Sequence, residues 1–449
     1  MIDMGSTQVS TFGETLRKKR EEAGLSLRGF ADLVSYSPGW VSKIENGLGS
    51  PTLQMARLCD NKLSAGGELI GLVQEIPAIR QRVEPPFQLP RDAECVIGRQ
   101  RELRILNDCL NRSTKATTGM LVSIEGGVGT GKTSLAVRWA HQVADSFGGG
   151  TLFADLQGYS GHHEPVSAKQ VLKDFLTTLG VDSVDIPASL GQRAAFFRTL
   201  TARRRVLVVL DNAADYPQVQ PLLPGGPGCA VVVTSRRRLM ELAVRDQAFT
   251  LPVGPLAADD AVNVLRSFVG DTRSSAEAAA SRVLARQCGY VPLALRIAGF
   301  RLATSRPTQE LIRDLANPVT RLDLLSDAKD IALSVRAALE RSYRDLDKSA
   351  ARMFRLFGLV PPGLTAPAAA ALSDWPMCRS RRALESLVDI HLVHYDGDGR
   401  YTLDELNSAF AAERAFAEES AKECMTAMER LADWLKNQSA AMTRRPLVG

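Results

Sequence analysis

The eight residues from Gly126 to Thr133 read GGVGTGKT and match the phosphate-loop pattern G-x-x-x-x-G-K-[ST]. Glycines at this spacing let the backbone curl so that successive N–H groups point at phosphate oxygens. Lys132 would supply a mobile positive charge for the outer phosphates, and the Thr133 hydroxyl would ligate Mg²⁺. The stretch therefore predicts a nucleotide site, unless it is a chance glycine-rich turn.

The residues on either side of this loop argue against a chance turn. Met120 to Ile124 is a short apolar run that predicts a buried strand. From Lys132 to Val143, apolar residues recur at helical spacing. A strand, a loop and a helix in that order would place the phosphates at a helix N-terminus, where the helix dipole favours anions.

Two further apolar runs end in residues suited to phosphate chemistry. Val206 to Leu210 leads into Asp211, whose carboxylate would face Thr133 at the carboxyl edge of a parallel sheet and hold Mg²⁺. Cys229 to Thr234 leads into Arg236, and an arginine there can sense a γ-phosphate. Arg237 and Arg238 follow, so which of the three points inward stays open. The predicted catalytic residues are Lys132, Thr133, Asp211 and Arg236, with Thr133 and Asp211 on the metal.

Composition places few limits on the chain. Its 449 residues leave room for about three domains, and 45% of them are hydrophobic. A net charge of +5 is compatible with nucleic acid without being evidence for it. Seven scattered cysteines without a C-x-x-C pair favour reduced thiols and a cytoplasmic location. No apolar run approaches the roughly 20 residues that span a membrane, so we expect no membrane partner.

Residues 11–75 read as short helices separated by tight turns, with Ser26 and Ser37 as N-caps and Pro38 at a first helical position. Apolar residues at helical spacing define the buried faces. The side chains left outward on the helix after Ser37 are those that a recognition helix would use in a major groove. Arg28, early in the preceding helix, would reach the DNA backbone. The predicted DNA-binding residues are Arg28, Ser37, Gly39, Trp40, Ser42 and Lys43. A small protein-interaction domain is the alternative.

The hydrophobic pattern of the remaining chain changes twice along the sequence. From about Val96 to Leu251, apolar runs alternate with helical patterns, which predicts a parallel sheet wrapped by helices. Helical periodicity alone follows, from Gly254 to Leu315. Later helices precede a hairpin signal at Asp396-Gly397, which together indicate a winged helix. The predicted fold is multidomain: an all-α helix-turn-helix domain (11–75), a linker (76–94), an α/β P-loop NTPase domain (95–252), a helical domain (253–325), a winged-helix domain (326–416) and a C-terminal helical tail (417–449).

Five motifs occur in order between about Pro90 and Ala415, and they resemble the NB-ARC class of STAND ATPases. They are CVIGRQREL (95–103), GGVGTGKTS (126–134), VLVVLDNAAD (206–215), VVVTSRRRL (231–239) and CGYVPLALRIAG (288–299). The resemblance implies that ATP or ADP binds with Mg²⁺, that the first motif meets the adenine and that Pro292 packs on it. The nucleotide-binding residues so implied are Ile97, Gly98, Arg99, Gly126, Gly127, Val128, Gly129, Thr130, Gly131, Lys132, Thr133, Ser134 and Pro292.

The chain departs from this family pattern at two positions. Asn212 stands where many members have a second acid, so no general base is evident and we expect slow hydrolysis. Asp404 stands where a histidine contacts the ADP β-phosphate in the family. Because a carboxylate repels a diphosphate, the closed ADP state would be weakened, or this contact would be absent.

Residues 12–75 resemble the XRE (lambda-repressor-like) helix-turn-helix family, and the stretch from Leu16 to Gly47 carries the resemblance. It implies binding to double-stranded DNA. Together the two resemblances predict a nucleotide-switched transcriptional regulator that acts as a homo-oligomer. The alternative is a signalling or defence STAND ATPase whose N-terminal helices recruit a protein partner. A metabolic kinase is less well supported, because neither a substrate-binding domain nor a catalytic base is evident.

Overall fold

The computed structural model divides the chain into two compact units between Glu84 and Pro85. The structure describes residues 12–34, 36–49, 51, 53–75, 84–92, 96–114, 118–159, 164–269, 275–304, 307–327, 330, 333–361 and 363–443. Most of the predicted linker, at 76–83 and 93–94, and Cys95 of the first NB-ARC motif lie outside this range.

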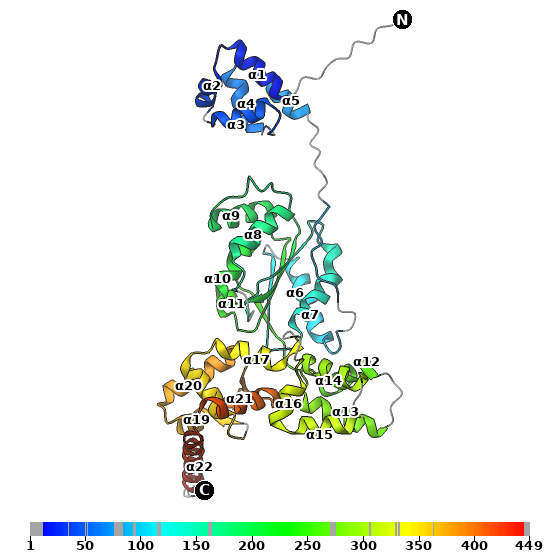
Figure 1. Cartoon of the computed structure of the whole chain (residues 1–449), viewed down its shortest axis with the longest axis vertical. Coiled ribbons are helices and arrows are strands. Elements are labelled where there is room, and N and C mark those ends of the chain that lie inside the picture. Colours follow the sequence, from blue (N-terminus) through cyan, green and yellow to red (C-terminus); the bar gives the residue numbers. More distant parts are fainter. Residues whose placement is uncertain are drawn as a thin grey trace. The chain divides into compact units, whose positions relative to one another are not determined.

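The first unit is a set of short helices around one apolar core (Figure 1). They are α1 (Phe12–Glu22), α2 (Leu27–Leu33), α3 (Pro38–Glu45), α4 (Leu53–Lys62) and α5 (Glu68–Glu75). The predicted caps are confirmed, because Ser26 Oγ accepts from Gly29 N and Ser37 Oγ accepts from Trp40 N. A buried ion pair joins α1 to α3, with Arg20 Nε 2.6 Å from Glu45 Oε1.

The second unit is built on a parallel sheet, as predicted. Its described strands lie in the order β2-β3-β4-β1-β5, and every pairing between them is parallel. They are β1 (Met120–Glu125), β2 (Thr151–Asp155), β3 (Leu207–Ala213), β4 (Ala230–Ser235) and β5 (Phe249–Pro252). Three of these strands, β1, β3 and β4, coincide with the apolar runs named above, and β2 lies in the stretch where further apolar runs alternate with helical patterns. The fifth was not predicted because it is short and largely exposed, with only Leu251 buried.

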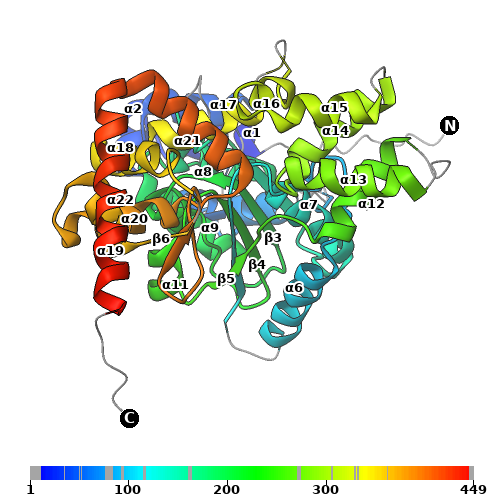
Figure 2. The same ribbon diagram turned by 90° about the horizontal axis from the view of Figure 1, so that it is seen from below.

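Helices cover both faces of this sheet (Figure 2). The segments are α6 (Gln100–Ser113), α7 (Lys132–Val143), η1 (Ala144–Ser146), α8 (Ala168–Thr178), α9 (Leu190–Thr201), α10 (Tyr216–Val219), η2 (Gln220–Leu222) and α11 (Met240–Arg245). On β3, Leu207 and Val209 join the apolar cluster of α6 and α7. Val208 and Leu210 join the cluster of α8 and α9. This alternation explains why β3 reads as a continuous apolar run.

The chain after the sheet forms a helical layer and then a winged-helix arrangement. The layer contains α12 (Ala258–Val269), α13 (Ser275–Gln287), α14 (Pro292–Thr304), α15 (Thr308–Ala316) and α16 (Pro318–Leu324). Then come α17 (Val335–Arg344), α18 (Lys348–Phe357), β6 (Leu364–Thr365), α19 (Ala366–Ser373), α20 (Met377–Asp389), β7 (His394–Tyr395), β8 (Arg400–Thr402), α21 (Glu405–Glu418) and α22 (Ala421–Thr443).

The predicted hairpin is confirmed and belongs to a small antiparallel sheet. β7 pairs with β8, and β8 pairs with β6, in the order β6-β8-β7. Gly397 and Gly399 in its turn have φ values of 86° and 90°, which glycine adopts without strain.

Within the described residues, no helix is both long enough and apolar enough to cross a bilayer.

Candidate nucleotide-binding site

The phosphate loop joins β1 to α7 at the carboxyl edge of the parallel sheet. Gly129 and Gly131 have φ values of 71° and 87°, a backbone conformation that residues with a Cβ rarely adopt. At Gly129, a Cβ would also lie only 2.9 Å from the Leu293 side chain. The loop therefore needs glycine at these two positions, and it directs the N-terminus of α7 into the pocket beside it.

Lys132 is buried at the start of α7 and folds back on the loop. Its Nζ donates to Gly126 O at 2.8 Å and to Gly127 O at 2.7 Å. Burial, and then the positive charge of Arg236, lowers the pKa of Lys132 to about 7. An anion in the pocket would offset both effects, so the site favours negatively charged ligands.

Thr133 and Asp211 meet in the pocket, as their positions in the sequence predicted. Thr133 Oγ1 donates to Asp211 Oδ1 at 2.8 Å, and Thr234 Oγ1 donates to the same oxygen at 2.5 Å. Burial raises the pKa of the Asp211 carboxyl, whereas these two hydrogen bonds lower it. A hydroxyl and a carboxylate are ligands that suit Mg²⁺, which takes its other positions from phosphates and water. The residues present therefore fit this metal.

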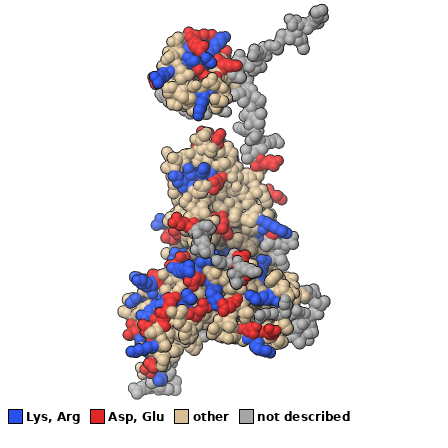
Figure 3. All heavy atoms as spheres, in the orientation of Figure 1, with Lys and Arg blue, Asp and Glu red and all other residues tan. Residues whose placement is uncertain are grey.

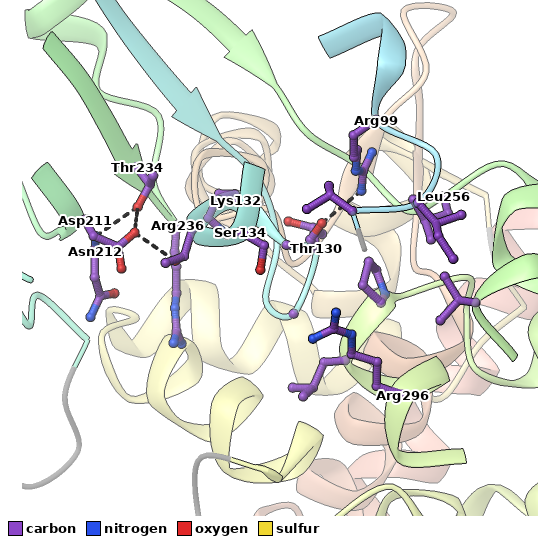
Figure 4. Close-up of a pocket in the computed structure, with 18 of the residues that line it drawn as sticks. Arg99, Thr130, Lys132, Ser134, Asp211, Asn212, Thr234, Arg236, Leu256 and Arg296 are labelled. Atoms are coloured by element: carbon purple, nitrogen blue, oxygen red, sulfur yellow. Dashed lines mark hydrogen bonds between the residues drawn. The ribbon is translucent and has the colours of Figure 1, made fainter. Parts of the chain in front are cut away.

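Of the three consecutive arginines after β4, Arg236 is the one that lines this pocket (Figure 4). Its Nη1 donates to Ala338 O in α17 at 3.1 Å, and its guanidinium lies 5.2 Å from the centre of the Tyr159 ring. Burial, and then the charge of Arg341, lowers the pKa of Arg236 to about 10. Arg237 and Arg238 line a neighbouring cavity instead.

Arg99 stabilises the phosphate loop by donating a hydrogen bond to its backbone. Its guanidinium contacts Glu102 Oε1 at 3.0 Å, Thr130 O at 2.9 Å and Gly254 O at 2.6 Å. Next to it the pocket, about 370 Å³ in volume, becomes apolar. The apolar lining residues are Val96, Ile97, Leu256, Val264, Pro292 and Leu293. A polar end at the loop and an apolar end at Ile97, Leu256 and Val264 suit a phosphate chain joined to a flat base.

Most of the residues predicted from the sequence line this pocket. They are Ile97, Arg99, Gly129, Thr130, Gly131, Lys132, Thr133, Ser134, Asp211, Arg236 and Pro292. Gly126, Gly127 and Val128 line a second cavity behind the loop, while Gly98 packs against Asp260. The lining residues that we did not predict include Leu256, Val264 and Arg296. Arg296 follows Pro292 by one helical turn, and this spacing is the signal that would have identified it.

The second cavity, about 190 Å³ in volume, contains the position where the family pattern has a histidine. Asp404 lies there and caps α21, accepting from Leu406 N and Asn407 N at 3.0 and 2.8 Å. His391 from the loop before β7 approaches the phosphate loop, its carbonyl oxygen 3.5 Å from where a Gly127 Cβ would be. Burial, with the charge of Lys132 adding to it, lowers the pKa of His391 to about 3.

The predicted DNA-binding residues lie in the first unit. Arg28, Ser37, Gly39 and Lys43 are exposed. Ser42 is half-buried and accepts from Asn46 Nδ2 at 3.3 Å. Trp40 is half-buried and stacks on Tyr36 with ring centres 4.6 Å apart. On the face drawn in Figure 3, acidic and basic side chains of this unit are interleaved.

Comparisons with known proteins identify both functional regions. Residues 11–71 match the helix-turn-helix domain, and residues 99–275 match the NB-ARC domain, which confirms the two predicted resemblances. The chain is 40% identical over 352 residues to the regulatory protein AfsR of Streptomyces coelicolor, covering 77% of this chain and 34% of that protein. It is 38% identical over 372 residues to the regulatory protein AfsR of Streptomyces griseus, covering 82% and 37%. The chain thus spans about a third of the length of these relatives.

The fold has a counterpart among solved structures. The Walker-type ATPase PABY2304 of Pyrococcus abyssi is similar with a TM-score of 0.52 and 13% sequence identity. The match covers 72% of this chain and 98% of that one. This similarity confirms the predicted P-loop ATPase fold of the second unit.

Proposed function

We propose that this chain, which joins a helix-turn-helix domain to an NB-ARC domain, is a DNA-binding transcriptional regulator switched by adenine nucleotide. In the proposal, ATP or ADP binds with Mg²⁺ in the pocket beside the phosphate loop. Exchange between the two nucleotides changes the conformation or the oligomeric state of the protein. That change then alters the affinity of the helix-turn-helix domain for DNA.

The proposal that a nucleotide binds here rests on one observation: Lys132, Thr133 and Asp211 line the same pocket. These residues would hold the phosphates and Mg²⁺, which supplies electrostatic stabilisation of the phosphate charge when bound. Arg236 supports the switch, because its guanidinium lines the same pocket and is bonded to α17. A γ-phosphate would compete with Ala338 O for this guanidinium, so ATP and ADP would have different effects on α17.

Hydrolysis in this site should be slow. Asp211 is the only carboxylate among the described residues that line the pocket, and Thr133 and Thr234 already engage it. Asn212, where a second acid could act as general base, has φ of 58°, a left-handed conformation that asparagine tolerates. Phosphate release at tens per second, typical of dedicated phosphoryl-transfer enzymes at roughly 1–100 per second, would contradict a switch.

The DNA part of the proposal requires more than one copy of the chain. One helix-turn-helix domain reads only a few base pairs, and pairing two domains on two half-sites is the usual remedy. We therefore propose double-stranded DNA and a second copy of this chain as partners. The matches to regulatory proteins from Streptomyces support the regulatory role.

A selection from a random DNA library tests this function. The full chain is presented with ATP, with ADP and without nucleotide, and Lys132→Ala serves as the matched variant that should not retain nucleotide. We expect enrichment of a paired motif whose strength depends on the nucleotide in the parent only. A lack of enrichment in every state would favour recruitment of a protein partner by the N-terminal helices.

A further inference from the structure

The positively charged side chains that line the nucleotide pocket differ in what they already contact. Among the described lining residues they are Arg99, Lys132, Arg236 and Arg296. Arg99 and Lys132 are bonded to the phosphate loop and its surroundings, and Arg236 is bonded to α17. Arg296 makes no hydrogen bond or ion pair with any other described residue. Among the described lining residues, Arg296 is therefore the cation that can bind a ligand without first breaking a contact with another described residue.

The helix that carries Arg296 is attached to the phosphate loop. Leu293 N in the first turn of α14 donates to Gly129 O at 3.2 Å. The Pro292 ring lies 3.9 Å from where a Cβ would be on Gly131. These contacts fix the start of α14 against the loop, so the direction of Arg296 relative to the loop is also restricted.

Arg296 lies on the face of α14 that borders the pocket. It follows Pro292 by four residues, and residues four apart share one face of a helix. Figure 4 shows its guanidinium directed from α14 into the pocket, while the residue as a whole remains solvent-exposed. A bound ligand would therefore find this side chain at the mouth of the pocket.

The chemistry of a guanidinium indicates which part of the ligand it meets. Its five N–H donors match the oxygens of a phosphate in a bidentate arrangement, and it carries its positive charge at all accessible pH values. The base has an apolar surrounding at Ile97, Leu256 and Val264, which offers no reason for a cation there. We infer that Arg296 binds the phosphate groups of the nucleotide and thereby ties the helical layer to nucleotide occupancy, an inference that rests on the proposed function.

Binding of ATP, ADP and adenosine to the full-length chain tests this inference. We expect Arg296→Ala to weaken binding of ATP and ADP by about 10-fold or more, the usual effect of losing a charge-assisted hydrogen bond. Adenosine lacks phosphates, so its affinity should not change. Arg296→Lys retains the charge without the planar fork and should restore part of the affinity. The matched control is Arg266→Ala, an exposed arginine on the adjacent helix α12 that does not line the pocket.

The possible results separate the inference from the proposed function. Affinities of Arg296→Ala for ATP and ADP within twofold of the parent would overturn the inference alone. An equal loss for adenosine would also overturn it, because it would indicate damage to the pocket instead of a lost phosphate contact. A parent chain that binds neither ATP nor ADP would overturn the proposed function and the inference with it.

Discussion

The guanidinium of Arg236 donates a hydrogen bond to the carbonyl oxygen of Ala338 at 3.1 Å, across 102 residues of sequence. Arg236 directly follows β4, which pairs with the strand that leads into the phosphate loop, whereas Ala338 belongs to α17, the first helix of the winged-helix arrangement. The bond therefore links the nucleotide pocket to the winged-helix arrangement. A ligand that attracts Arg236 into the pocket would weaken this link.

Replacement of Arg236 should affect ATP more than ADP. We expect Arg236→Ala to weaken ATP binding by about 10-fold, because a charge-assisted hydrogen bond to the γ-phosphate is lost. ADP has no γ-phosphate, so its affinity should change by less than about threefold. Titration calorimetry with both nucleotides provides the measurement, and Arg237→Ala is the control. Equal losses for ATP and ADP would show that Arg236 does not distinguish the two.

Lys132 should make nucleotide binding depend on pH. Burial lowers its pKa to about 7, so Lys132 is mostly neutral above pH 7 when the pocket holds no anion. Bound phosphates favour the charged form, so binding above pH 7 requires the uptake of a proton. The affinity should therefore fall as the pH rises, by about 20-fold between pH 7.5 and pH 9.

Calorimetry in buffers of different ionisation enthalpy checks this prediction. The parent should take up nearly one proton per nucleotide at pH 8.5. Lys132→Arg keeps its charge throughout this range, so any remaining binding should be nearly independent of pH. Proton uptake in Lys132→Arg equal to that in the parent would assign the effect to another group.

The substitution Asp404→His should lower stability instead of strengthening ADP binding. The sequence pattern suggested that the carboxylate at 404 would repel a β-phosphate. In the structure, Asp404 caps α21 by accepting hydrogen bonds from Leu406 N and Asn407 N. It is not one of the described residues that line the nucleotide pocket. Loss of an N-cap costs about 0.5–2 kcal/mol.

Chemical denaturation and ADP dissociation rates measure the two effects separately. We expect Asp404→His to reduce the free energy of unfolding by about 1 kcal/mol, while Asp404→Asn, which can still cap, stays close to the parent. ADP dissociation should be the same in all three proteins. Markedly slower dissociation from Asp404→His would restore the interpretation drawn from the family pattern.

The sequence predicts the contacts that follow from local patterns, but it does not predict contacts that depend on how distant segments pack. The phosphate loop and the pairing of Thr133 with Asp211 follow from local patterns, because each side chain ends a parallel strand or begins a helix at the same sheet edge. The approach of His391 to Gly127 depends instead on how the winged helix packs against the loop, which no local pattern encodes. Arg296 could have been identified from its spacing to Pro292 on one face of α14, although its exposed side chain gives no apolar signal.

In the first unit, Lys43 should contribute to DNA affinity without contributing to sequence preference. Its side chain is exposed in the last turn of α3, where phosphate contacts are expected, whereas Ser37 lies at the N-terminus of the same helix. We expect Lys43→Ala to weaken binding to all sequences alike and to reduce the salt slope by about 1, because one fewer counterion is displaced. Binding measured over a range of salt concentrations, with Lys62→Ala in α4 as the control, provides the test. A change of preferred sequence in Lys43→Ala would instead place this side chain at a base edge.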